Sequence, residues 1–145
     1  MIFKNFKLST NPQAVEIESE GHFFDLHNQG EFQGLRFDTV NRRVEFDWKF
    51  FGDRASSDLA THRIILQIVS VSFLAITPWD EAKPPGEASC LFGISRVVLN
   101  NDKVRFRAHW EPSDDSHLLF EFMSGQTIEV SGDMAMVQVS EIGSQ

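Results

Sequence analysis

Apolar and polar residues alternate along much of the chain, most regularly between residues 34 and 50. Four apolar residues alternate with charged ones in the second half of this stretch: Val44, Phe46, Trp48 and Phe50. This is the period-two pattern of a strand with one buried face. The first half alternates in the same way, and the Asp and Asn side chains of residues 38–41 favour a turn between the halves. The sequence therefore predicts a β-hairpin with a buried aromatic face.

Short alternating runs separated by turn residues predict further strands. They are expected within residues 2–8, 14–18, 22–27, 91–99, 104–110, 118–123, 127–130 and 134–139. Residues 63–77 are rich in Ile and Val, which indicates either a central strand or a bent strand that spans two sheets, ended by Pro78. About ten strands without a long helical pattern predict an all-β antiparallel sandwich or partly open barrel with little or no helix.

The length of 145 residues fits one β domain that covers residues 1–145. Paired prolines and a glycine predict an exposed loop at residues 80–89, and the polar residues 141–145 predict a frayed tail. A single cysteine excludes an intrachain disulfide, and we expect a reducing, cytoplasmic location. Lysines interrupt the apolar N-terminus, and no apolar run approaches the length of a membrane span, so neither a secretory signal nor membrane association is expected.

The formal net charge of −8 disfavours binding to nucleic acids and to anionic membranes. The chain contains no G-x-S-x-G, Walker, G-x-G-x-x-G or H-E-x-x-H motif, which counts against the common hydrolases, nucleotide enzymes and zinc proteases. We therefore expect no cofactor, no metal and no nucleic-acid partner.

Asp25 and His27 form the best candidate for acid–base chemistry, because on a strand they share one face while His22 points the other way. They could act as a base and the group that orients it. The alternative is that they form the polar outer face of a half-buried strand.

A basic strand is the most pronounced charge feature: Lys103, Arg105, Arg107 and His109. These residues could bind an anion or an acidic partner, because guanidinium groups match carboxylates and phosphates. Alternatively they form ion pairs across a sheet with the outward-facing acids Glu45, Asp47, Glu121 and Glu129.

Trp79 lies beside the proline-rich loop, where it either anchors a partner or covers the core at a strand end. Cys90 is flanked by Leu91 and Phe92 and is interpreted as a small buried apolar residue.

The segment FDLHNQGEFQGLRFDTVNRRVEFDWKF, residues 24–50, is followed by the apolar run 64–76. Together they resemble the opening of small bacterial all-β proteins, some of them grouped with immunity proteins of polymorphic toxin systems. The resemblance implies a non-catalytic protein that binds another protein, and it transfers no functional residue.

The leading hypothesis is a non-catalytic, cytoplasmic protein-binding domain, of an immunity or scaffolding type, whose acidic surface binds a basic partner. A second hypothesis is a β-barrel or jelly roll that encloses a small apolar ligand or a carbohydrate. A third is an enzyme centred on Asp25 and His27. A homodimer formed through an edge strand is compatible with each of them.

Overall fold

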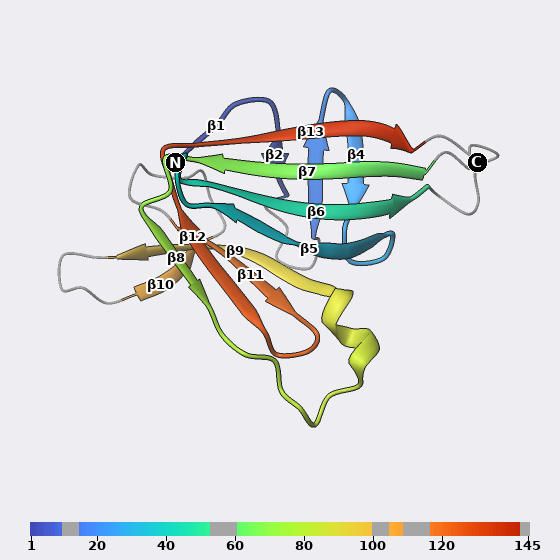
Figure 1. The fold of residues 1–145 in the computed structure, drawn as a ribbon. Helices are drawn as coiled ribbons and strands as arrows, with labels where there is room; N and C mark the ends of the chain where they lie inside the picture. The colour runs from blue at the N-terminus through green and yellow to red at the C-terminus, as the bar shows by residue number, and fades with distance from the viewer. Residues whose placement is uncertain (10–14, 53–60, 100–104, 109–116, 143–145) are drawn as a thin grey trace.

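The computed structural model describes residues 1–9, 15–52, 61–99, 105–108 and 117–142. Thirteen strands and a 3₁₀ helix occur in these residues (Figure 1). They are β1 (Ile2–Phe3), β2 (Lys7–Leu8), β3 (Glu16–Ser19), β4 (His22–Asp25), β5 (Gly30–Asp38), β6 (Arg43–Phe51), β7 (Thr61–Val69), β8 (Phe73–Ile76), η1 (Pro85–Ser89), β9 (Leu91–Leu99), β10 (Arg105–Ala108), β11 (His117–Phe122), β12 (Thr127–Ser131) and β13 (Met134–Ile142).

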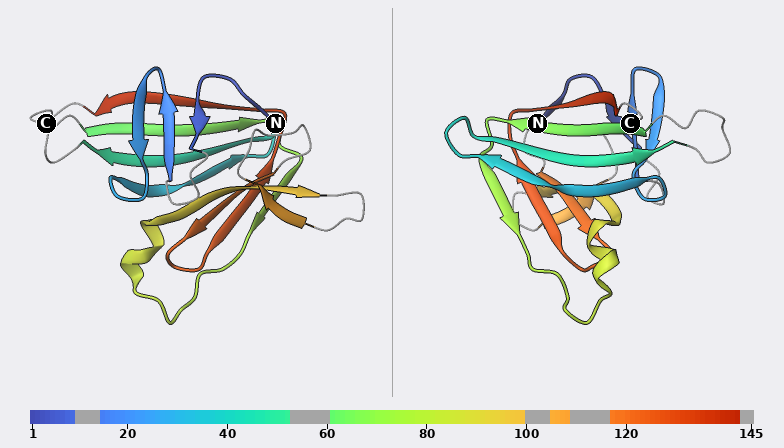
Figure 2. Two further views of the ribbon diagram at one scale, coloured as in Figure 1. Left: turned by 180° about the vertical axis from the view of Figure 1, so that it is seen from behind. Right: turned by 45° about the vertical axis from the view of Figure 1, so that its right-hand side comes forward.

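The strands form three sheets. Sheet I has the order β1-β13-β7-β6-β5, sheet II the order β10-β9-β11-β12-β8, and sheet III the order β2-β3-β4. Neighbouring strands are antiparallel except for β1 and β13, which are parallel. Sheets II and III pack on the same face of sheet I (Figures 1 and 2). The predicted all-β sandwich is confirmed, and the arrangement is not a closed barrel.

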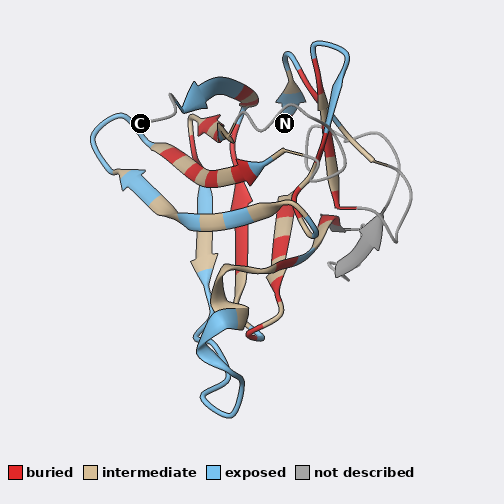
Figure 3. Ribbon diagram, turned by 90° about the vertical axis from the view of Figure 1, so that its right-hand side faces the viewer, coloured by how far each residue is buried: buried red, intermediate tan, exposed pale blue. Residues whose placement is uncertain are grey.

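The predicted hairpin is formed by β5 and β6, with Leu35 opposite Phe46 across the pair. Its turn uses the expected chemistry, because one carboxylate oxygen of Asp38 accepts hydrogen bonds from the backbone amides of Val40 and Asn41. On β6, buried and half-buried residues alternate from Arg43 to Phe50, and Phe51 at the end of the strand is exposed (Figure 3). The four apolar residues predicted to be buried are therefore all in the core.

Aromatic rings fill the space between sheets I and II. The ring of Phe46 stacks on Phe120 of β11 with 4.2 Å between the centroids, and it also stacks on Trp48. Phe32 of β5 contacts Phe122 at 4.8 Å. Such rings bury a large apolar area and add specific ring–ring attraction, so this cluster is the main link between the two sheets.

The run of residues 63–77 is a bent strand that spans two sheets, which is one of the two predicted alternatives; the other was a single central strand. Its first part belongs to β7 of sheet I, and its second part is β8 of sheet II. The bend occurs at Ser70, whose φ is 53°, and the amide of Ser72 then bonds to the carbonyl of Ser131 in sheet II. The strand ends at Ile76, before Pro78.

Three details of the prediction need correction. The described residues contain more strands than the expected ten, because several are only two to four residues long. The loop at 80–89 contains the short helix η1, which begins just after Pro84. Glu141 and Ile142 are not part of a frayed tail, because they pair with His62 and Thr61 in the ladder between β13 and β7.

No helix among the described residues is long and apolar enough to cross a membrane.

We expect Phe46→Ala to lower the free energy of unfolding by about 3–5 kcal/mol, because it removes a fully buried ring from the contact between the sheets. Phe37→Ala is the matched control, since the side chain of Phe37 on the same hairpin is 41% exposed, and we expect it to cost at most about 1 kcal/mol. Urea unfolding followed by Trp fluorescence measures both. Similar losses for the two variants would contradict this description of the core.

Candidate functional site

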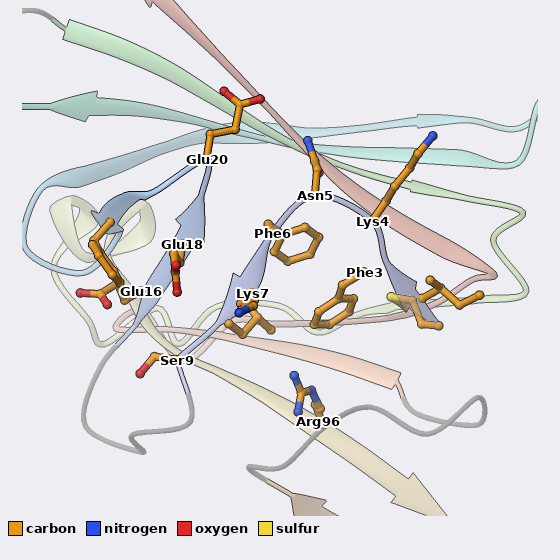
Figure 4. Close-up of a pocket in the computed structure, with 14 residues that line it drawn as sticks. Phe3, Lys4, Asn5, Phe6, Lys7, Ser9, Glu16, Glu18, Glu20 and Arg96 are labelled. Carbon is orange, nitrogen blue, oxygen red and sulfur yellow. The ribbon is translucent and has the colours of Figure 1, made fainter.

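A hollow lies between the N-terminal segment, sheet III and β9 (Figure 4). Its volume is about 800 Å³, and it is open to solvent on one side. Residues 1–9 provide most of its lining, β3 and β4 provide a wall, and Arg96 of β9 lies at its base. The strands of three different sheets thus meet around one concavity.

The base of the hollow is aromatic and holds one buried cation. The rings of Phe3 and Phe6 stack with 4.6 Å between their centroids. The guanidinium carbon of Arg96 lies 5.2 Å from the centroid of Phe3, although the residue as a whole is only 7% exposed. Arg96 is opposite Leu118 in sheet II, so it points to the core side of that sheet. A cation over a ring is attracted most strongly where water is excluded.

The wall of the hollow is an acidic surface on sheet III. We call it the acidic face and define it as Glu16, Glu18, Glu20 and Phe23, which line the hollow, together with Asp25, which is opposite Glu16 in the ladder between β3 and β4. Its residues on β3 and β4 alternate with the buried Ile17 and Phe24, so they point away from the core.

Phe23 lies in the middle of the acidic face. It is directly opposite Glu18 in the ladder between β3 and β4, and Glu18 is opposite Lys7 of β2. The side chain of Phe23 is 61% exposed, although a large apolar side chain of this kind is ordinarily buried. The face therefore combines several carboxylates and one lysine with an accessible aromatic ring.

Asp25 and His27 do not form the predicted acid–base pair. The carboxylate of Asp25 accepts hydrogen bonds from the backbone amides of His27 and Asn28 and from the side chain of Asn28. The ring of His27 points elsewhere, with Nδ1 2.8 Å from the carbonyl oxygen of Leu91. Asp25 thus stabilises the turn after β4, and the two side chains make no hydrogen bond with each other in the described structure.

Cys90 lies beside His27 but is not activated by it. Its Sγ atom is 3.7 Å from Nδ1 of His27, which is already within bonding distance of a carbonyl oxygen. Burial raises the pKa of the Cys90 thiol, and the negative charge of Glu87 raises it further. Both effects disfavour the thiolate, which is the nucleophilic form. Cys90 is half-buried, whereas the sequence predicted a small buried residue.

The predicted basic strand is only partly described. Lys103 and His109 lie outside the described residues. Arg105 and Arg107 belong to β10, at one edge of sheet II, where Arg107 is opposite Val97, but their side chains also lie outside the described part of the chain. Their binding role therefore stays a prediction.

Two of the acids expected to pair with that strand, Glu45 and Asp47, are bound by arginines of sheet I instead, so the predicted lattice is wrong for these two. On the outer face of sheet I, Glu45 is bound by Arg36, and Asp47 by Arg63 with 2.7 Å between Asp47 Oδ2 and Arg63 Nη2. These partners come from the adjacent strands β5 and β7, which bring opposite charges side by side.

Glu129 has a partner that the sequence did not predict. Its side chain is 9% exposed, and Oε1 lies 2.8 Å from Nδ1 of His117 on the neighbouring strand β11. The ring of His117 also contacts Phe73 of β8, with 4.9 Å between centroids. The pair thus forms part of the packing on sheet II.

Trp79 does not cover the core, because its side chain is 57% exposed. The backbone on both sides is fixed, since the amide of Thr77 bonds to Thr127 and that of Asp80 bonds to Ser124. Trp79 is thus an exposed ring on an anchored segment, and its role as a partner anchor stays a prediction.

No family model, curated protein or solved structure matches this chain. The resemblance to immunity proteins therefore stays a prediction. Within the described residues, no group of three or more His, Cys, Asp or Glu side chains is arranged to hold a metal ion.

The hollow and the acidic face were not predicted as a site. The alternation within residues 14–18 did predict a short strand, but not that its charged residues form a site. The signal that could have drawn attention to it is Phe23, an aromatic residue at a position whose neighbours in the ladder are charged. The aromatic base of the hollow could not be predicted from the sequence, because Phe3 and Arg96, which contact each other there, are distant in the chain.

The ion pair at Glu45 predicts how stability depends on pH. The hydrogen bond from Arg36 lowers the pKa of Glu45 below its usual 4.5, and Gln67 acts in the same direction, while burial opposes them. A lowered pKa in the folded state stabilises the fold above pH 4.5, and this contribution is lost as the pH falls through the folded-state pKa.

Lowering the pH from about 7 to about 3 should decrease the free energy of unfolding of the wild type. We expect the decrease to be smaller in Glu45→Gln, which has no carboxylate to protonate at this position. Arg36→Met, which removes the main cause of the shift, should reduce the pH dependence in the same way. Urea unfolding at both pH values measures the difference. An unchanged pH dependence in both variants would show that this pair does not contribute.

Proposed function

We propose that this chain is a non-catalytic protein-binding domain that holds a basic segment of a partner protein on the acidic face. The observation that carries the proposal is the exposed ring of Phe23 among carboxylates, at the rim of a hollow with an aromatic base. Aromatic residues surrounded by polar groups are typical of the energetically important positions in protein interfaces.

The chemistry of the acidic face suits lysine and arginine side chains. Their long apolar stems can pack on the ring of Phe23, while their charged ends reach Glu16 and Glu18 on the adjacent strand. The net charge of −8 also attracts a basic partner over a longer range and speeds its association. Lys7 of β2 is paired in register with Glu18 of this face.

Two observations support binding over catalysis. The carboxylate of Asp25 is engaged in a turn, and the thiol of Cys90 has a raised pKa. An immunity-type role, in which the partner is a toxin, is one form that such binding could take. This role agrees with the resemblance of residues 24–50 to immunity proteins of polymorphic toxin systems.

A small-molecule ligand is the second candidate, and the size of the hollow favours it. Its volume of about 800 Å³ falls within the range of about 300–1,000 Å³ that is usual for ligand sites. The stacked rings of Phe3 and Phe6 could hold an apolar group or a sugar there. An uncharged ligand held by these rings does not require the charges of the acidic face, which separates the two candidates.

We expect a capped decapeptide of alternating Arg and Thr to bind the chain at low salt, and the double variant Glu16→Gln/Glu18→Gln to weaken binding about fivefold. The expected reason is the loss of two carboxylates from the acidic face. Phe23→Ala should weaken it as well, since the ring packs against the arginine stems. Isothermal titration calorimetry measures these affinities.

The matched control is Glu31→Gln/Glu81→Gln, which removes the same charge from exposed positions outside the acidic face. It should bind the peptide nearly as well as the wild type. Equal weakening in the two double variants would show that the peptide responds only to net charge and would contradict the proposed site.

A further inference from the structure

The outer edge of β13 is closed along its first half only. The strand β1 pairs with β13 at Met134 and Ala135, and no further. The next position is closed by a side chain: the amide of Asn5 donates to the carbonyl oxygen of Val137 at 2.7 Å and accepts from its N–H at 2.9 Å. Asn5 thus makes the two hydrogen bonds that a neighbouring strand would make.

Beyond Asn5 the edge is open. Backbone groups in a strand face the same neighbour at every second residue, so those of Val139 and Glu141 point outward as those of Val137 do. They make no hydrogen bond with any residue in the described part of the chain. The side chains of Val139 and Ile142 are each 40% exposed. An open edge with exposed apolar side chains is a template for pairing with another strand.

The opposite edge of sheet I is protected in a way that β13 is not. A bulge between Phe32 and Gly34 interrupts the ladder of β5, and the helix η1 lies against this strand. Bulges and covering segments are the usual means of preventing strand addition. The open half of β13 has neither among the described residues.

We propose that the open edge of β13, residues 138–142, accepts an extended segment of the basic partner as an added strand. This inference rests on the proposed function and specifies how the partner binds. Backbone hydrogen bonds to Val139 and Glu141 would supply affinity, and the acidic face would select basic side chains. The turn between β3 and β4 projects past β13 at this edge (Figures 1 and 2), so a strand added there passes close to Glu20.

Charge favours such a partner over a second copy of this chain. Glu141 lies on the open edge, and Glu20 is exposed in the adjacent turn. Pairing two copies about a two-fold axis would bring both Glu141 side chains, and two chains of net charge −8, close together. A basic segment meets the same groups with attraction.

Amide hydrogen exchange followed by NMR tests this inference at single residues. In the free chain we expect the amides of Val139 and Glu141 to exchange quickly, while those of Gln138 and Ser140, which face β7, exchange slowly. The Arg–Thr decapeptide should slow exchange at Val139 and Glu141 by at least about tenfold at saturation. A control peptide of the same sequence, with every second backbone amide N-methylated, keeps the charge and should give no such protection.

A variant provides an independent check. Val139→Pro removes an outward N–H that β7 does not use, so it should weaken binding of the unmethylated peptide and leave binding of the methylated peptide unchanged. The exchange measurement on the wild type does not depend on how well this variant folds.

Several results would overturn the inference. If the peptide binds and loses affinity in Glu16→Gln/Glu18→Gln without protecting Val139 and Glu141, strand addition is wrong but the proposed function stands. If neither peptide binds, both are wrong. Protection of these two amides that rises with protein concentration in the free chain would show that a second copy occupies the edge, which also overturns the inference.

Discussion

The contact between Phe46, Trp48 and Phe120 is the interaction on which the rest of the structure depends. It joins β6 of sheet I to β11, the middle strand of sheet II, through rings that are fully buried. Because the rings are large and stack in defined orientations, they fix both the separation of the sheets and their relative position. Sheet II in turn places Arg96 beneath Phe3, so the base of the hollow exists only when the sheets are held together.

Asn5 connects this core to the acidic face. Its backbone oxygen accepts a hydrogen bond from the Ser19 hydroxyl at 3.0 Å, and its side chain is bound to Val137 of β13. Sheet III is further held by Phe24, whose ring meets that of Phe50 edge-on at 5.2 Å. The carboxylates of the acidic face therefore stand on a supported sheet, and a supported site loses less entropy when it binds a partner. Asn5 also separates the closed half of the β13 edge from the open half.

The sequence predicted the features that depend on local pattern and missed those that depend on distant contacts. The hairpin and its Asp38 turn follow from alternation and turn chemistry within a few residues. The bend at Ser70 was only one of two alternatives, because nothing in the sequence marks where a β-branched run changes sheets. The hollow and the Asn5 bridge could not be predicted, since they join residues that are far apart in the sequence: Asn5 and Val137 are separated by 132 residues. Ion-pair partners were mispredicted for the same reason: outward charges were recognised, but strand order decides which of them meet.

The most direct test of the proposed binding site is to map where a basic peptide contacts the chain. We would record ¹⁵N chemical shifts while adding the Arg–Thr decapeptide at low salt, and repeat the titration at high salt. The account predicts that the largest changes occur at Glu16, Glu18 and Phe23, and that they fade as salt screens the charges. Changes centred on the outer face of sheet I, around Glu45 and Asp47, with none on the acidic face, would contradict it.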